Sequence, residues 1–291
     1  MKTIVLLVVV VCGSFFVNQV NAQMAISIYN LDETMKAEKI DDLLFTAKYE
    51  MTFIHDTVKP ESRQEETMML KVGKNVSQFY SYSKYMSDSL VNEAIQNGTV
   101  KETFQDIVKQ FQPKITYQLY KNFPVGKVMT LDRLAMSSFR CEEENERPVW
   151  QIQSDTMTIN TYPCQKATCR FKGRDYDAWF TTEIPISEGP WKLYGLPGLI
   201  IKATDSEGHY TFECTGIQQA HPGGSIMYGG KDYEPMSRKN LNKLYERFSS
   251  DPVGYIKSMA PNVTITIQGE DGQPAKDPKN MPYNPIEREG K

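Results

Sequence analysis

Histidine and catalytic sequence motifs are scarce in this chain of 291 residues. The three histidines, His55, His209 and His221, contain no i, i+4 pair and no H-E-x-x-H zinc motif. The G-x-S-x-G turn of serine hydrolases, the phosphate-binding loop and the dinucleotide fingerprint are also absent. The sequence therefore predicts no catalytic residue, no metal ligand and no cofactor.

An excess of positive charge is missing as well. Lys and Arg number 33 against 36 Asp and Glu, which gives a formal net charge of −3, whereas nucleic-acid-binding proteins usually carry a basic surface. Hydrophobic residues make up 40% of the chain and aromatic residues 11%, and this content excludes wholesale disorder. The composition predicts an ordered globular protein that does not bind nucleic acid.

Long apolar runs are confined to the N-terminus. Lys2 precedes the apolar stretches 4–11 and 15–17, which are shorter than the roughly 20 residues of a membrane-spanning helix. Ala22 lies at the −1 position of a small-residue cleavage site. We therefore expect a signal peptide over residues 1–22. The mature protein is then exported, to the periplasm or the outer envelope, and has no integral membrane segment.

Export changes the interpretation of the cysteines. Removal of Cys12 with the signal peptide leaves four cysteines, and an even number in an oxidising compartment favours two disulfide bonds. These candidates are Cys141, Cys164, Cys169 and Cys214. The alternating patterns around Cys169 and Cys214 favour a bond between those two, although all pairings stay open. A metal or redox site is the alternative, but the C-x4-C spacing of Cys164 and Cys169 does not fit it.

Alternating hydrophobicity indicates strands along most of the chain. Leu43–Phe53 alternates cleanly, and Glu66–Val72 and Val76–Tyr82 predict a hairpin around the turn 73–75. Further strand patterns cover Ile115–Tyr120, Val149–Gln153, Thr156–Ile159, Ala167–Phe171, Ala178–Ile184, Leu199–Ala203, Tyr210–Ile217 and Val263–Ile267. The short spacing predicts a mainly β fold: a single curved antiparallel sheet, as a half-barrel or open barrel, with two or three short helices.

Two segments have helical periodicity. Apolar residues recur at i, i+3, i+4 and i+7 in Val100–Phe111, and Ser237 can cap a second helix that ends near Phe248. Residues 269–291 are rich in proline, glycine and charge, which predicts a mobile or loosely packed tail. We therefore expect one β-rich domain over residues 23–268.

Residues 150–205 are unlike ordinary strand and loop sequence. They contain Gly-Leu-Pro-Gly-Leu-Ile at 195–200, preceded by Ala-Trp-Phe at 178–180, Glu-Ile-Pro at 183–185 and Gly-Pro-Trp at 189–191. In this order the segment resembles the GLPGLI family of exported Bacteroidetes proteins. The resemblance implies a family whose function is generally unknown, so it supplies no activity.

The signature segment is compatible with two roles. Because Pro197 and Gly198 suit the central positions of a type II turn, the first role is a structural corner that leads into a buried strand. This corner comprises Gly195, Leu196, Pro197 and Gly198. The second role is a rigid platform beside a ligand or partner. Its candidate binding residues are Arg174, Asp177, Trp179, Trp191 and Tyr194. For Arg174, an ion pair that braces a strand edge competes with a clamp on a charged ligand.

Two other clusters have ordinary explanations. The acidic run Glu142–Glu144, together with Glu146, is expected in a solvated loop and not as a catalytic carboxylate pair. The 14 methionines are scattered, so we expect them to fill the core and not to bind copper. Neither cluster predicts a site.

Export, aromatic strands and the missing catalytic set lead to one main functional hypothesis. We expect a non-enzymatic binding or interaction module whose concave, aromatic-lined face receives an apolar ligand or an envelope protein partner. The alternative is a hydrolase or metal-dependent periplasmic enzyme that uses His209, His221 and nearby carboxylates. That alternative requires these groups to converge within hydrogen-bond reach.

The expected signal peptide determines where the mature chain begins. Protein recovered from the cell envelope should start at Gln23, because cleavage follows the small residue Ala22. Mass spectrometry of the N-terminal peptide measures this directly. An Ala22→Leu variant, which removes the small residue, should accumulate as precursor, and an envelope protein that still begins at Met1 would contradict the prediction.

Overall fold

The structure is a computed structural model, and it positions most of the chain. The described residues are 36–111, 113–135, 137–261 and 276–288. The expected signal peptide over residues 1–22 and the expected strand Val263–Ile267 lie outside the described residues.

Strands dominate the described part of the chain, as the alternating patterns predict. They are β1 (Glu38–Phe53), β2 (Gln64–Gly73), β3 (Ser77–Ser81), β4 (Gln118–Lys121), β5 (Lys127–Leu134), β6 (Ser137–Glu144), β7 (Gln151–Ile159), β8 (Tyr162–Phe171), β9 (Arg174–Thr181), β10 (Leu199–Asp205), β11 (Tyr210–Gln219), β12 (Ser225–Tyr228) and β13 (Glu234–Pro235). The helices of this part are α3 (Tyr82–Gln96), α4 (Val100–Gln110), α5 (Arg238–Ser250) and α6 (Pro252–Met259), with single 3-10 turns at Pro60–Ser62 and Gly230–Asp232.

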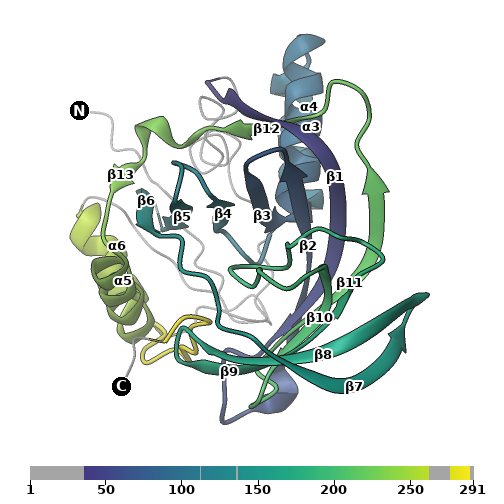
Figure 1. The fold of residues 1–291 in the computed structure, drawn as a ribbon. Coiled ribbons are helices and arrows are strands. Elements are labelled where there is room, and N and C mark those ends of the chain that lie inside the picture. Colours follow the sequence, from purple (N-terminus) through teal and green to yellow (C-terminus); the bar gives the residue numbers. More distant parts are fainter. Residues whose placement is uncertain (1–35, 112, 136, 262–275, 289–291) are drawn as a thin grey trace.

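The strands form one open sheet. Their order is β13-β6-β5-β4-β3-β2-β1-β11-β10-β9-β8-β7, and β12 pairs with the start of β1. The pairing is antiparallel apart from the short parallel contact of β13 with β6. Figure 1 shows the sheet curving around an interior. The predicted mainly β fold with a single curved antiparallel sheet and few helices is therefore confirmed.

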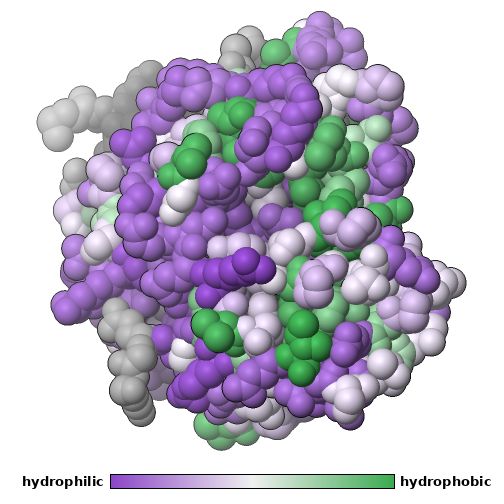
Figure 2. Space-filling view, in the orientation of Figure 1, coloured by the Kyte–Doolittle hydropathy of each residue, from purple (hydrophilic) through white to green (hydrophobic). Residues whose placement is uncertain are grey.

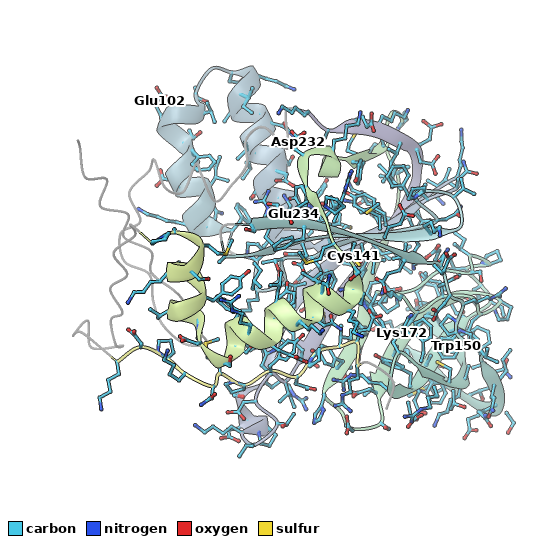
Figure 3. All side chains as sticks on the ribbon, turned by 90° about the vertical axis from the view of Figure 1, so that its left-hand side faces the viewer. Glu102, Cys141, Trp150, Lys172, Asp232 and Glu234 are labelled. Atoms are coloured by element: carbon cyan, nitrogen blue, oxygen red, sulfur yellow. The ribbon has the colours of Figure 1, made fainter. Side chains whose placement is uncertain are left out.

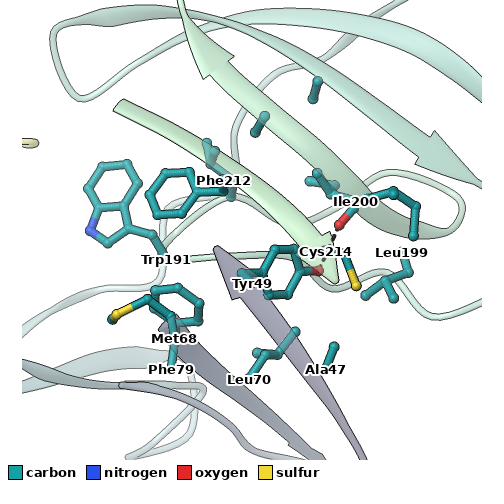
Figure 4. Packing of buried hydrophobic residues seen from close by; sticks show 14 of the residues in the cluster. Ala47, Tyr49, Met68, Leu70, Phe79, Trp191, Leu199, Ile200, Phe212 and Cys214 are labelled. Atoms are coloured by element: carbon teal, nitrogen blue, oxygen red, sulfur yellow. Dashed lines mark hydrogen bonds between the residues drawn. The ribbon is translucent and has the colours of Figure 1, made fainter. Parts of the chain in front are cut away.

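The main hydrophobic core fills the concave side of this sheet. Every second residue of β1 from Phe45 to Phe53 is buried, because alternate residues of a strand face the same side. Figure 4 shows Tyr49 among these core residues, and its ring contacts Phe79 edge-on with centroids 6.2 Å apart. The Tyr49 hydroxyl donates a 2.7 Å hydrogen bond to the Ile200 carbonyl. The buried phenol thus keeps a partner and links β1 to β10.

The helices lie at two places on the sheet (Figure 1). Helix α4 matches the predicted Val100–Phe111 closely, and α5 begins directly after Ser237, whose hydroxyl accepts a hydrogen bond from the Asn240 N–H. Helix α5 packs with α6 and β6 around a second cluster of buried residues. Helix α3 was not predicted, because its only buried residues are Ser87, Val91 and Ala94 and they form no strong apolar stripe.

Apolar side chains on the surface are dispersed. Figure 2 shows a mostly polar face on which apolar residues gather in small groups. The large apolar residues with exposed side chains are Leu44, Val58, Val125, Val149, Ile152, Met157, Met227 and Met259. No helix in the described part of the chain has both the length and the apolar character needed to cross a membrane.

The cysteines differ from the prediction of two disulfides, because all four are free and buried in the structure. Cys169 on β8 and Cys214 on β11 are separated by β9 and β10. Three strand spacings place these residues about 14 Å apart across the sheet, whereas the Cα atoms of a disulfide lie within about 7 Å. Cys141 packs in the α5–α6 cluster and Cys164 in the main core. The alternating patterns located the strands of Cys169 and Cys214 but did not show that two other strands lie between them.

Thiol titration distinguishes the two states. Without reductant, the mature protein in guanidinium chloride should react with four equivalents of Ellman's reagent, because Cys141, Cys164, Cys169 and Cys214 are free. The native protein should react slowly, since burial raises the pKa of Cys141 and Cys214 to about 11. Two equivalents or none in the denatured protein would restore the disulfide hypothesis.

Candidate functional site

The segment between β9 and β10 folds back into the concave side of the sheet. We call residues 182–198 the inner plug. Trp191, Leu193 and Leu196 of the plug are at most 2% exposed and belong to the main core. Figure 4 shows Trp191 on the same side of the core as Phe212. The signature segment therefore fills the interior of the curved sheet.

Polar contacts from other elements hold the inner plug in place. The Lys121 ammonium on β4 pairs with the Glu188 carboxylate at 2.5 Å and donates to the Gly189 carbonyl at 3.0 Å. The Tyr194 hydroxyl donates to the Asn145 carbonyl at 3.1 Å. The plug is thus anchored to β4 on one side and to the chain after β6 on the other.

Two glycines of the signature have geometry that other residues cannot adopt. Gly195 has φ +100°, in the region that favours glycine. A Cβ atom at Gly198 would lie 2.0 Å from the Thr181 carbonyl oxygen. The prediction of a type II turn with positive φ at Gly198 is therefore wrong, because the positive φ belongs to Gly195 and Gly198 permits a close approach of two backbones. Leu196 is buried, and the corner leads into β10.

A pocket of about 180 Å³ lies between the concave face, the inner plug, α5 and the C-terminal segment. Its apolar and aromatic walls include Met51, Ile115, Leu119, Trp191, Tyr245 and Tyr283. Trp191 has φ +51°, which is strained for a bulky residue and is tolerated only where the surroundings hold it. An apolar cavity of about 150 Å³ can bind benzene, so this pocket has room for one ring-sized group.

Two polar groups at this pocket differ in their hydrogen bonding. Asp132 accepts hydrogen bonds from the Thr116 hydroxyl at 2.8 Å and from the Tyr245 hydroxyl. Burial raises the pKa of Asp132 and outweighs these hydrogen bonds, which lower it. Tyr117 also lines the pocket, and its buried hydroxyl has no hydrogen-bond partner among the described residues. Leaving a buried hydroxyl unpaired costs about 1–3 kcal/mol, which a ligand could recover.

Beside the pocket, charged side chains from four elements form a partly buried network around the buried Lys192, which we call the ion quartet. Lys192 of the inner plug donates to Glu143 at 2.8 Å and to Glu287 at 2.7 Å, and Arg238 of α5 donates to Glu143 at 2.8 Å. Burial alone raises the pKa of Glu143, but the attraction of Arg238 and Lys192 outweighs it and lowers the pKa to about 2. The prediction of a solvated acidic loop is therefore wrong for Glu143, which lies on β6.

Arg174 ties the C-terminal segment to the sheet. Its guanidinium pairs with Asp205 at 2.6 Å, with both side chains 1% exposed, and donates to the Asn284 amide oxygen at 2.7 Å. The Asn284 amide nitrogen donates in turn to the Ile54 carbonyl at 2.7 Å. Figure 3 shows this C-terminal segment passing beside α5. Arg174 is a brace in this structure, and residues 283–288 of the predicted loose tail are held in place by these bonds.

The five predicted binding residues do not meet at one place. Of the five, only Trp191 lines the pocket. Asp177 and Trp179 lie on the face of β9 opposite to the buried Tyr176, and Asp177 pairs with Lys166 at 2.7 Å. Alternation along β9 therefore points two of the predicted residues away from the interior.

The residues of the enzymatic alternative are also separated. His209 lies near Asp205 and Glu207, with one ligand atom of each within 4.8 Å of the others. Arg288 pairs with Glu207 at 2.6 Å, and Asp205 is paired as described above, so arginines already neutralise both carboxylates. His221 follows the opposite end of β11, roughly 30 Å away at the usual rise per strand residue. The two histidines therefore do not converge.

The polar residues of the pocket were missed in the sequence. Asp132 lies on β5, whose apolar residues occur on both faces and show no clean alternation. The sequence signal that could have predicted a buried carboxylate is the position of Asp132 among the apolar residues Val128, Leu131 and Leu134. Lys192 gave a similar signal, since it is a lone charge between Trp191 and an apolar signature.

Comparisons with known proteins identify the segment that contains the inner plug. The family model described as "Protein of unknown function (Porph_ging)" matches residues 171–202 and supports the GLPGLI resemblance. Among curated proteins, none matches the chain. Two solved structures of PNGF-II, in space groups P21 and C2, align over 69% of this chain with TM-scores of 0.45 and 0.46 and identities of 11% and 13%. The chain spans about a third of the length of PNGF-II, since the alignment covers 32% of it.

Replacement of Lys192 tests the ion quartet. Lys192→Met removes the ammonium that Glu143 and Glu287 share, and we expect the free energy of unfolding to fall by about 3 kcal/mol because Glu287 loses its 2.7 Å partner and Glu143 keeps only Arg238. Lys202→Met is the matched control, since the Lys202–Glu213 pair lies on the surface and should contribute less than about 1 kcal/mol. Urea unfolding followed by circular dichroism measures both variants. Equal losses would contradict a special role for the quartet.

Proposed function

We propose that this member of the GLPGLI family is an exported, non-enzymatic binding protein whose interior pocket receives a small aromatic or apolar group that carries a polar substituent. The observation that supports it most directly is a preformed pocket with apolar walls and one buried, unpaired hydroxyl, that of Tyr117. Export rests on the expected signal peptide over residues 1–22.

The walls favour an apolar body for the ligand. Met51, Leu119 and Trp191 are each at most 2% exposed in the folded chain and line the pocket. Small-molecule sites are typically concave, mainly apolar and formed before the ligand arrives. The volume of about 180 Å³ suits one ring or a short branched chain.

The polar groups favour one hydrogen bond to the ligand at Tyr117. Asp132 is already paired with Thr116 and Tyr245, and Arg238 is engaged by Glu143. The Tyr117 hydroxyl has no such partner among the described residues. A ligand hydroxyl or carbonyl that reaches it would satisfy a buried group and gain affinity over an otherwise identical apolar molecule.

Paired probes test the proposal. Calorimetry or ligand-observed NMR should show that p-cresol binds about tenfold more tightly than toluene, a difference of one hydrogen bond. Tyr117→Phe should remove this preference and leave toluene binding unchanged. Equal affinity of the wild-type protein for the two probes, or no binding of either, would overturn the proposal.

A second pair of variants locates the binding. Asn242 on α5 is half-buried and lines the pocket, whereas its neighbour Lys243 is exposed. Asn242→Phe should fill the pocket and weaken p-cresol binding at least about tenfold, and Lys243→Phe should change it less than about twofold. If both variants bind p-cresol as the wild-type protein does, the probe occupies another place and the interior pocket is not the site.

A further inference from the structure

A second pocket, of about 300 Å³, lies on the other face of the sheet. It is lined by residues of β2, β3 and β4, by α3 and by β12. Lys71 and Tyr80 line this outer pocket, while their neighbours Leu70 and Phe79 belong to the main core. Alternation along the strands therefore gives the two pockets different residues from the same strands.

Lys71 is a partly buried cation that lies over two tyrosine rings. Its ammonium lies 5.1 Å from the ring centroid of Tyr85 and 5.6 Å from that of Tyr80. Within the described residues, Lys71 makes no hydrogen bond and no ion pair. Burial lowers its pKa, and the nearby charge of Asp88 only partly opposes this. Two aromatic rings offset part of the cost of burying the ammonium, but an anion at this place would offset more.

The nearest carboxylate in the pocket is already engaged. Asp88 and Lys84, one turn apart on α3, pair at 2.9 Å. Lys84 and Asp88 both line the pocket and offset each other, so Lys71 leaves one net positive charge there. A single negative charge on the ligand fits Lys71 best.

The remaining walls offer amide and hydroxyl groups. Gln78 and Gln118 are 4% and 6% exposed, and the Gln78 amide donates to the Gln118 side-chain oxygen at 3.3 Å and to the Tyr120 hydroxyl at 3.0 Å. Asn92 of α3 lies on the opposite wall. Such groups hydrogen-bond ligand hydroxyls, and tyrosine rings present flat apolar faces to a ligand body.

We propose that this outer pocket binds a hydroxylated organic acid with one carboxylate, held by an ion pair to Lys71. The carboxylate meets the ammonium between the rings of Tyr80 and Tyr85. The hydroxyl groups of the ligand meet the amides of β3, β4 and α3. The site is separate from the interior pocket, so either can fail without the other.

Calorimetric titration with D-glucuronate tests this site, because glucuronate combines one carboxylate with several hydroxyls. D-glucose, which lacks the charge, should bind at least about tenfold more weakly, and so should inorganic phosphate. Lys71→Met keeps the apolar stem and removes the charge, and it should weaken glucuronate binding at least about tenfold. Lys48→Met is the matched control: Lys48 also lies over a tyrosine ring, that of Tyr82 at 4.2 Å, but does not line the pocket.

The outcomes separate clearly. Loss of binding in Lys71→Met with binding retained in Lys48→Met supports the site. Thermal unfolding checks that Lys71→Met is folded, which is expected because the variant removes a partly buried charge that has no ion-pair partner among the described residues. Glucose binding as tight as glucuronate binding, stronger binding of phosphate, undiminished binding by Lys71→Met, or no binding of glucuronate would each overturn the proposal.

Discussion

The buried ammonium of Lys192 is the constraint on which the interior of this protein depends. An ammonium that is 4% exposed needs close anions, and here they come from Glu143 on β6 and Glu287 near the end of the chain. Arg238 then balances the second negative charge and brings α5 to the same place. One lysine therefore sets the relative positions of the inner plug, a sheet strand, a helix and the C-terminal segment. Of these elements, the inner plug, α5 and the C-terminal segment also line the interior pocket.

The same strands of the curved sheet supply side chains to the main core on one face and to the outer pocket on the other. In β2, β3 and β4, residues such as Leu70, Phe79 and Leu119 complete the main core, while Lys71 and Tyr80 face the opposite side. The inner face is closed by the plug and the C-terminal segment, and the outer face by α3 and β12. A one-residue shift in the register of any of these strands would exchange the two sets of side chains. Both pockets are thus tied to one hydrogen-bonding register.

Much of the sheet was predictable from the sequence because many of its strands alternate, but β5 and β6 were not predicted. The alternating pattern of Leu43–Phe53 predicts the buried face of β1, and the capping residue Ser237 predicts the start of α5. The pocket was far less predictable, since its walls come from segments distant in the chain. Glu143 lies in an acidic run that suggests a solvated loop, and only the approach of Lys192 and Arg238 makes it a partly buried ion-pair partner. Glycines of the signature suggested a turn, but the need for glycine at Gly198 comes from Thr181 on the neighbouring strand.

The hydrogen bond between Arg174 and Asn284 and the pairing of β1 with β11 bear on how the protein folds. Strand β1 pairs with β11, which is more than 150 residues further along the chain. The hydrogen bond from Arg174 to Asn284 also joins segments that are 110 residues apart. Contacts between distant segments slow folding because the intervening chain must first be closed into a loop. Until β11 pairs with β1, one edge of β1 has no partner strand, and until Asn284 docks, the Arg174 guanidinium lacks one of its buried partners. The partly folded protein therefore offers the edge of β1 as a template for other strands, and the arrival of β11 ends that exposure.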